Sequence, residues 1–161
     1  PPPRGTLKMN VDAHLSGDDR WFSGLILRRC DGSIVGASTR AHTGIGDAIF
    51  GEALGLNEAV CWLEKIGHGR VIIELDSQIL VNAVKRKGRI RHCWGYSVQR
   101  CVSFLEANPN SDIKWVSRLG NQAAHLLAKW AEKEPNIEWS NSVPLCIMPQ
   151  IQKDLGFVHS V

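Results

Sequence analysis

The sequence predicts an α/β domain in which three strands are followed by alternating helices and strands, in the order βββ–α–β–α–α–β–α. Residues 6–13 alternate between apolar and polar side chains, as a half-buried strand does, and two apolar runs at 21–29 and 34–40 follow. After Phe50 the apolar residues recur at helical spacing. The later run Val71–Leu75 is nearly all apolar, which is typical of a central strand covered on both faces. The change of period separates an antiparallel β part from an α/β part.

The first three strands are expected at Thr6–Ala13, Trp21–Arg29 and Ile34–Arg40. The second and third are separated by a short turn that contains Asp31 and Gly32. Asp-Gly between two apolar runs is a strong signal for a β-hairpin. A polar loop joins the first strand to the second, so all three strands are expected to pair antiparallel in sequence order.

The second part of the domain is expected to contain four helices and two strands. The helices are predicted at Phe50–Ile66, Ser77–Lys85, Trp94–Glu106 and from Asn121 to about Glu134, and the strands at Val71–Leu75 and Ile113–Val116. The last helix begins at Asn121, whose side chain is of a type that caps helix N-termini. No internal repeat interrupts this order.

The chain divides into a linker at residues 1–5, a domain at 6–134 and a C-terminal extension at 135–161. For the extension two alternatives stay open, a short helix over 147–157 packed on the domain or an irregular segment. The sequence does not begin with Met, so we expect it to be a fragment or a processed form.

The composition is that of an ordinary globular protein, with 43% hydrophobic residues, 22% charged residues and a net charge of +3. No apolar run approaches the roughly 18 residues that a membrane helix needs, so no membrane association is expected. The five cysteines are odd in number and form no CxxC pair, which argues against a disulfide framework and a zinc module. Since a signal segment is also lacking, we expect an intracellular protein of the nucleus or cytoplasm.

Three carboxylates are predicted on three different elements, Asp12 and Asp76 at strand ends and Glu52 near the start of the long helix. Glu52 lies in the apolar stripe one turn before Leu56, where a carboxylate is costly unless something positive meets it. Ligand crevices in mixed sheets lie at the carboxyl ends of strands, so the three side chains are expected to converge. Oxygen ligands favour Mg²⁺ or Mn²⁺ over zinc. Two such ions about 4 Å apart would activate a water and stabilise the leaving oxygen of a phosphodiester.

Five sequence blocks, in their order and spacing, resemble a ribonuclease H type 1 domain and are most similar to its plant retroelement-derived branch. The blocks are PPPRGTLKMNVDA, GLILRRCDGSIVGAS, GEALGLNEAV, VIIELDSQILVNAV and VSRLGNQAAHLLAKWA, within residues 1–134. The resemblance implies a ribonuclease H-like fold with a five-stranded mixed sheet flanked by helices. It also implies two-metal hydrolysis of the RNA strand of an RNA–DNA hybrid. Two settings stay open, a retroelement polyprotein with a reverse transcriptase before Pro1 or a free-standing host protein.

The resemblance implies four acidic residues, of which Asp12, Glu52 and Asp76 match the first three. The fourth position, in the last helix, is occupied by His125, and the preceding loop 117–120 lacks the histidine that many ribonucleases H carry there. Imidazole ligates Mn²⁺ or Zn²⁺ but is a poor ligand for Mg²⁺, so the second ion is expected to bind weakly or not at all. We therefore expect reduced, Mn²⁺-preferring cleavage, with a catalytically inactive nucleic-acid-binding module of the same fold as the alternative. A packed or surface histidine with no ligand role is the other interpretation of His125.

A basic stretch between the second and third helices is the expected contact with nucleic acid. Its five cations are Lys85, Arg86, Lys87, Arg89 and Arg91. Such side chains neutralise phosphates without reading bases, so salt-dependent and sequence-independent affinity is expected. Asn10 and Asn121 are further expected contacts, and Asn10 with the loop His14–Asp19 is expected to help recognise the 2′-hydroxyl. Trp94 and Tyr96 could stack on a sugar or base, although aromatic residues at a helix start more often belong to the core.

Each carboxylate also has a simpler interpretation. Asp12 could be a solvated strand-end residue, Asp76 could cap the helix after it, and Glu52 could answer the dipole of its helix. Their joint occurrence in ordered blocks favours the metal site. A transposase or integrase core shares the general fold, but its usual Asp-Asp-Glu order does not match. Three tryptophans are expected in the core: Trp62, Trp115 and Trp130.

Overall fold

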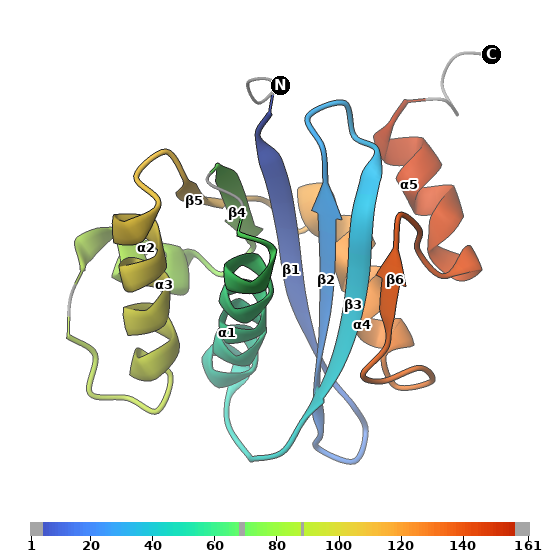
Figure 1. Ribbon diagram of the computed structural model, residues 1–161. Coiled ribbons are helices and arrows are strands. Elements are labelled where there is room, and N and C mark those ends of the chain that lie inside the picture. The colour runs from blue at the N-terminus through green and yellow to red at the C-terminus, as the bar shows by residue number, and fades with distance from the viewer. Residues whose placement is uncertain (1–4, 68–69, 88, 157–161) are drawn as a thin grey trace.

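The computed structural model describes residues 5–67, 70–87 and 89–156, so that residues 1–4 of the expected linker lie outside it. At its centre is a six-stranded mixed sheet with the strand order β5-β4-β1-β2-β3-β6 (Figure 1). The strands are β1 Leu7–Leu15, β2 Trp21–Arg28, β3 Ile34–His42, β4 Val71–Leu75, β5 Asp112–Trp115 and β6 Glu138–Ser140. β4 pairs parallel with both β1 and β5, whereas the other pairs are antiparallel. The predicted α/β class and the first five strands are confirmed.

Helices cover both faces of the sheet (Figure 1). They are α1 Ala48–Ile66, α2 Gln78–Arg86, α3 Gly95–Ala107, α4 Gln122–Trp130 and α5 Met148–Asp154, with the 3-10 turns η1 Leu119–Asn121 and η2 Leu145–Ile147. The larger core lies between the sheet and α1, α2 and α3, and a smaller one lies between the sheet and α4 and α5. None of the described helices has the length and apolarity that crossing a bilayer requires.

The two faces of β1 have opposite chemical characters. Met9 and Val11 are fully buried in the larger core. Asn10 and Asp12 alternate with them and therefore face α4; they are buried too, with 1% and 3% of their surface exposed. The central strand β1 therefore carries polar side chains, one of them a carboxylate, in the interior of the fold. The burial of Asp12 also excludes its interpretation as a solvated strand-end residue.

The helix ends decide the two simpler interpretations of the other carboxylates. Asp47 caps α1 by accepting a hydrogen bond from the backbone N–H of Phe50, so Glu52 lies in the second turn. The helix dipole acts on charges in the first turn, so it does not explain the position of Glu52. Ser77, not Asp76, caps α2. At α4 the N-cap position falls on Asn121 as predicted, but its side chain makes no capping hydrogen bond, and the helix ends at Trp130, four residues early.

Gly24 brings α4 into direct contact with the sheet. It lies opposite Asp12 in the β1–β2 register. A Cβ atom built there would lie 2.4 Å from the backbone nitrogen of Ala128 and 2.7 Å from the backbone oxygen of Ala124. Only a residue without a side chain allows so close an approach. The glycine therefore lets α4 place His125 over the polar row of β1.

The C-terminal extension is folded onto the domain. Its strand β6, which the sequence prediction missed, pairs with β3 at Gly36–Ser38, and three residues are too few to show a period. Val143, Ile147 and Ile151 pack in the smaller core against β2, β3 and α4. Of the two alternatives for residues 147–157, the structure shows the short helix, α5, although Phe157 lies outside the described residues.

Candidate metal centre

Asp12, Glu52 and Asp76 converge as the sequence predicted. Each offers a carboxylate oxygen, and these oxygens all lie within 4.8 Å of one another. They come from β1, the second turn of α1 and the residue after β4. The Oε2 atom of Glu52 is buried and has no hydrogen-bond partner among the described residues. A buried carboxylate oxygen without a partner is costly, so Glu52 lacks the positively charged or hydrogen-bonding complement that its position requires.

The electrostatics of the cluster support the same conclusion. Burial, followed by the negative charges of Asp12 and Asp76, raises the pKa of Glu52 to about 10. Burial and the Asp12 charge also raise the pKa of Asp76, while Arg118 acts in the opposite direction. Three carboxylates that cannot all ionise together become compatible when divalent cations neutralise them. The donors are all oxygens, so the residues fit Mg²⁺ or Mn²⁺.

His125 occupies the fourth position of the cluster. Its Nδ1 atom lies 2.8 Å from Oδ2 of Asp12, and 28% of its side chain is exposed. Because an ionised carboxylate only accepts hydrogen bonds, Nδ1 carries the hydrogen in this pair and Nε2 remains available. The structure therefore brings His125 to the site, in contact with one of the expected ligands.

Arg118 and Trp115 border the cluster, and the sequence prediction did not include either in the site. Arg118 Nε lies 4.0 Å from Oδ2 of Asp76, and 79% of the arginine side chain is exposed. Trp115 was expected in the core, which is wrong: half of its surface is exposed, and its Nε1–H donates a hydrogen bond to the backbone oxygen of Asp76. Trp115 is the last residue of the edge strand β5, where no further strand covers it.

Asn10 and Asn121 are buried beside the cluster and are occupied within the protein. Asn10 donates to Oδ1 of Asn121 at 3.0 Å and to Oε1 of Glu74 at 2.9 Å, and Asn121 donates to the backbone oxygen of Val11 at 2.8 Å. Each asparagine is 1% exposed. Contrary to the expectation from the sequence, neither has surface to offer a nucleic acid. Their hydrogen bonds instead fix the start of α4 to β1 beside Asp12.

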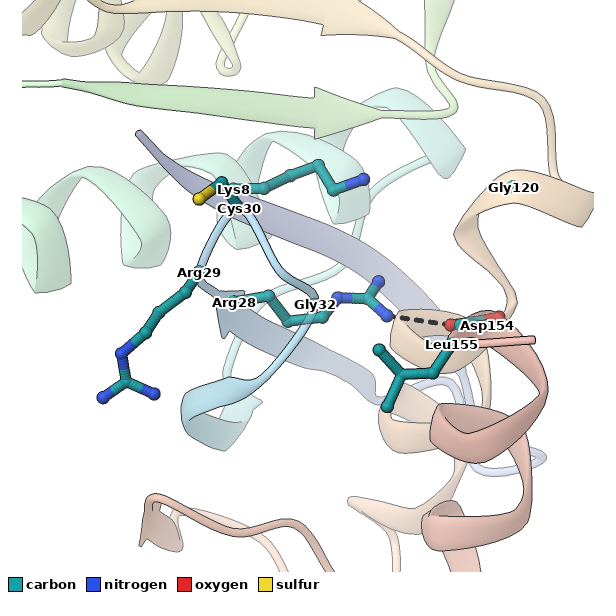
Figure 2. A pocket seen from close by; sticks show the side chains of 8 residues that line it. All are labelled: Lys8, Arg28, Arg29, Cys30, Gly32, Gly120, Asp154 and Leu155. Carbon is teal, nitrogen blue, oxygen red and sulfur yellow. Dashed lines mark hydrogen bonds and ion pairs between the residues drawn. The ribbon is translucent and has the colours of Figure 1, made fainter. Parts of the chain in front are cut away.

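Arg28 connects this network to the C-terminal extension. Its guanidinium donates to Asn10 Oδ1 at 3.0 Å and to Asp154 Oδ2 in α5 at 2.8 Å, and only 8% of its side chain is exposed. Figure 2 shows the guanidinium directed at Asp154 while Arg29 points away from both. The pair borders a hollow of about 260 Å³ between the β2–β3 turn and α5. A nearly buried cation of β2 thus has its acidic partner in the extension.

The amino-acid sequence of residues 10–131 matches the family described as reverse transcriptase-like. This match covers well over half of the chain. The chain belongs to the reverse transcriptase-like family. The extension, residues 135–161, lies wholly outside the match. No curated protein sequence matches the chain.

Solved structures share the fold of this domain. Ribonuclease H1 of the archaeon Halobacterium salinarum is 20% identical, with 80% of this chain and 98% of that chain covered and a TM-score of 0.70. The N-terminal ribonuclease H domain of a Mycobacterium tuberculosis protein is 18% identical, with coverage of 80% and 94% and a TM-score of 0.69. LC11 ribonuclease H1, solved in complex with an RNA/DNA hybrid, is 15% identical, with coverage of 80% and 96% and a TM-score of 0.65. The domain therefore has a ribonuclease H-like fold.

The basic stretch of this ribonuclease H-like domain begins inside α2, since Lys85 and Arg86 form its last turn and Lys87 caps it, and continues into the segment before α3. The described cations are all exposed: Lys85, Arg86, Lys87, Arg89 and Arg91. Gly88 lies outside the described residues. Trp94 is half-buried against the larger core and stacks on His92, whereas Tyr96 is 68% exposed. In the loop expected to recognise the 2′-hydroxyl, His14 belongs to β1 and pairs with Glu132.

Proposed function

We propose that the protein is a metal-dependent endonuclease that hydrolyses the RNA strand of RNA–DNA hybrids. The observation that carries this proposal is the buried cluster of Asp12, Glu52 and Asp76, with carboxylate oxygens within 4.8 Å of one another and Glu52 Oε2 unpartnered. Membership of the reverse transcriptase-like family supports it. So does the likeness to LC11 ribonuclease H1, whose structure was solved with an RNA/DNA hybrid.

The three carboxylates would hold divalent cations, Mg²⁺ or Mn²⁺, at the cluster. Bound there, such ions supply a nucleophilic water at neutral pH and charge neutralisation for the phosphodiester. Glu52 must lose the proton that the metal-free site retains. Asp12 lies at the centre of the arrangement, since it contacts His125 and raises the pKa of both other carboxyls.

The remaining residues bind and orient the substrate in this proposal. The five cations at the end of α2 and in the segment before α3 neutralise phosphates, which gives affinity without a sequence preference. His125 holds Asp12 in one orientation through its Nδ1–H, and its Nε2 is available to a phosphate oxygen or a water. Since imidazole replaces a carboxylate at the fourth position, the second ion is held more weakly, and Mn²⁺ supports cleavage better than Mg²⁺.

A binding module without turnover is the second candidate function. The contact of 2.8 Å between His125 Nδ1 and Asp12 Oδ2 favours it, because one oxygen of the central ligand is already occupied by a nitrogen donor. Such a module would hold hybrids through its basic surface and leave the RNA strand intact.

The deciding experiment is cleavage of an end-labelled RNA–DNA hybrid by the purified chain in Mg²⁺ and in Mn²⁺. Asp12→Asn should lower the rate by more than about a hundredfold, because changes outside the direct ligands already cost 10–100-fold. Asp31→Asn, which alters an exposed carboxylate on the β2–β3 turn, is the matched control and should cleave like the parent. Equal rates in Asp12→Asn and parent would sink the nuclease proposal and point to a co-purified enzyme.

His125→Asp separates the two candidate functions. Faster cleavage than the parent, above all in Mg²⁺, would identify an enzyme limited at its fourth ligand. No cleavage by the parent but restored cleavage by His125→Asp would identify a binding module that is inactive because residue 125 is a histidine. No cleavage by either would reject the enzyme for this chain and leave hybrid binding to be measured.

A further inference from the structure

An exposed apolar and cationic surface borders the acidic cluster on its β5 side. Trp115, the last residue of β5, is 50% exposed, and Leu119, the first residue of η1, is 86% exposed. Arg118, between them, is 79% exposed and lies against Asp76. Single exposed apolar side chains are common, but exposed apolar surface bordered by charged residues often marks an interaction site.

The Trp115 ring is held in one orientation by the cluster itself. Its only polar atom, Nε1, donates to the backbone oxygen of Asp76 at 3.3 Å. The backbone next to it is fixed as well, since the N–H of Val116 donates to the oxygen of Leu75 at 2.9 Å. With its polar atom occupied, the exposed surface of the ring is apolar. It therefore presents an oriented flat apolar face beside a catalytic carboxylate.

The chemistry of this surface matches one ligand, a sugar–phosphate backbone. In a duplex the bases are stacked on each other, so a side chain outside the helix meets sugar C–H groups and phosphates. Trp115 offers an apolar plane, and Arg118, three residues later, offers a planar cation suited to phosphate. The guanidinium now pairs with Asp76, but its exposure leaves it free to turn outward when that carboxylate is neutralised.

We propose that Trp115 and Arg118 form a binding site for the nucleotide next to the scissile phosphate, with the indole packed on a sugar ring and the guanidinium on a phosphate. The inference rests on the proposed function in one respect, that the acidic cluster receives a nucleic acid. It adds a contact on the opposite side of the molecule from the C-terminal extension, since β5 and β6 are the two edges of the sheet.

The test measures binding of a fluorescein-labelled, blunt RNA–DNA hybrid by anisotropy in the Asp12→Asn background, with EDTA present and NaCl varied. Trp115→Ala should weaken binding about fivefold with an unchanged salt dependence, because the lost contact is apolar. Trp115→Phe keeps a ring without the N–H and should bind nearly like the parent. Arg118→Gln should make the slope of log Kd against log salt shallower by about one, because one fewer counterion is released.

Matched controls lie on the extension at the other edge of the sheet. Leu145→Ala removes an 89% exposed leucine, and Lys153→Gln removes an exposed cation of α5. Neither should change the affinity or the salt slope. Binding by Trp115→Ala and Arg118→Gln that is indistinguishable from these controls would overturn the inference. A Trp115→Ala effect confined to hybrids with an unpaired nucleotide would also overturn it, in favour of stacking on a base.

The outcome is separable from that of the proposed function. Cleavage by the parent with no binding defect in the two variants would remove only this site. The two predicted binding defects with no cleavage by the parent would remove the nuclease and keep the site. Thermal unfolding of each variant shows whether it remains folded, and Arg118→Gln, which alters an exposed side chain, carries the test if Trp115→Ala does not fold.

Discussion

Asn10 and Asp12 lie two residues apart on the same buried face of β1, yet they belong to regions of opposite character. Around Asn10, the side chains of Asn121, Glu74 and Arg28 all hydrogen bond to it, and in this group only the Nε of Arg28 is buried without a partner among the described residues. Around Asp12, two further carboxylates crowd together, and Glu52 Oε2 has no partner in the described part of the chain. One region is a polar network of paired donors and acceptors, and the other is a cluster of like charges that only the exposed Arg118 and the neighbouring His125 partly offset.

The comparison separates stability from function. Completed buried networks stabilise and specify a fold, whereas a partly satisfied one costs free energy unless a ligand completes it. The Asn10 network joins β1, β2, β4 and α4, and so supplies the rigid frame that holds the acidic cluster together. We therefore expect changes in the network to act on folding and changes in the cluster to act on metal binding and catalysis.

The largest effect on folding is expected from Asn10→Leu. This change leaves the buried Arg28 and Asn121 and the half-buried Glu74 each short of a partner, and an orphaned buried group costs about 1–3 kcal/mol. Because these groups can partly re-pair, we expect the free energy of unfolding to fall by about 3 kcal/mol in total. Urea denaturation measures it, with Asn82→Ala on the exposed side of α2 as the control. A loss no larger than that of the control would show that the network does not stabilise the fold.

The acidic cluster should make the stability of the metal-free protein depend on pH. The pKa of Glu52 is about 10 in the folded state, against an ordinary value of 4.5, so the folded state keeps a proton that the unfolded state loses. The contribution of Glu52 to stability is therefore greatest at low pH and falls as the pH rises from about 4.5 towards 10, by no more than about 1.4 kcal/mol per pH unit.

Glu52→Gln removes this titration and should flatten the dependence. Mg²⁺ or Mn²⁺ should reverse it, since the ions bind the ionised carboxylates and favour higher pH. Thermal unfolding in EDTA between pH 5.5 and about 8.5, with and without Mn²⁺, measures both effects. Parallel curves for parent and Glu52→Gln in EDTA would contradict the shifted pKa.

A smaller effect is expected from the link between the network and the extension. Arg28→Met leaves Asp154 and Asn10 without their common donor, and we expect it to cost about 2 kcal/mol, below the 3–5 kcal/mol typical of a fully buried pair, because 30% of the Asp154 side chain is exposed. Asp154→Asn keeps a hydrogen-bond acceptor and should cost less. A double-mutant cycle between Arg28→Met and Asp154→Asn gives the coupling directly, and a coupling near zero would mean that the pair is incidental.

The smallest effect is expected at the exposed ion pair of the extension. Glu138 in β6 contacts Arg40, with 63% of the glutamate side chain exposed, and Arg40 also reaches Glu58. Exposed pairs contribute about 0–1 kcal/mol, so Glu138→Gln should change stability by less than about 0.5 kcal/mol. Chemical denaturation of Glu138→Gln and Asp154→Asn gives the loss of unfolding free energy for each variant. A clearly larger loss for Asp154→Asn would show that burial of the ion pair, and not its place in the extension, determines the size of the loss.

Local sequence patterns predicted most strands and helices, but they did not predict which polar side chains the rest of the fold would bury. Alternation located β1, the Asp-Gly turn between two apolar runs located β2 and β3, and the apolar stripe located α1. Asp12, Glu52 and Asp76 could therefore be placed at element ends that converge. The burial of Asn10 and Asn121 could not be foreseen, because a polar residue on a strand or at a helix start is solvated unless the fold covers it. Trp115 was placed in the core by its residue type, whereas its exposure follows from the edge position of β5.

The glycine beneath α4 sets a limit on how this protein can diverge. A side chain at position 24 would collide with the backbone of Ala124 and Ala128 and push the helix outward, carrying residue 125 away from Asp12. A carboxylate, amide or imidazole side chain at position 125 can therefore reach the acidic cluster only while position 24 remains glycine. In descendants of this sequence position 24 should therefore stay glycine while position 125 varies, and metal preference would depend on a residue that does not itself contact a metal. Substituting Gly24→Ala in His125→Asp, and finding cleavage unchanged, would break that link.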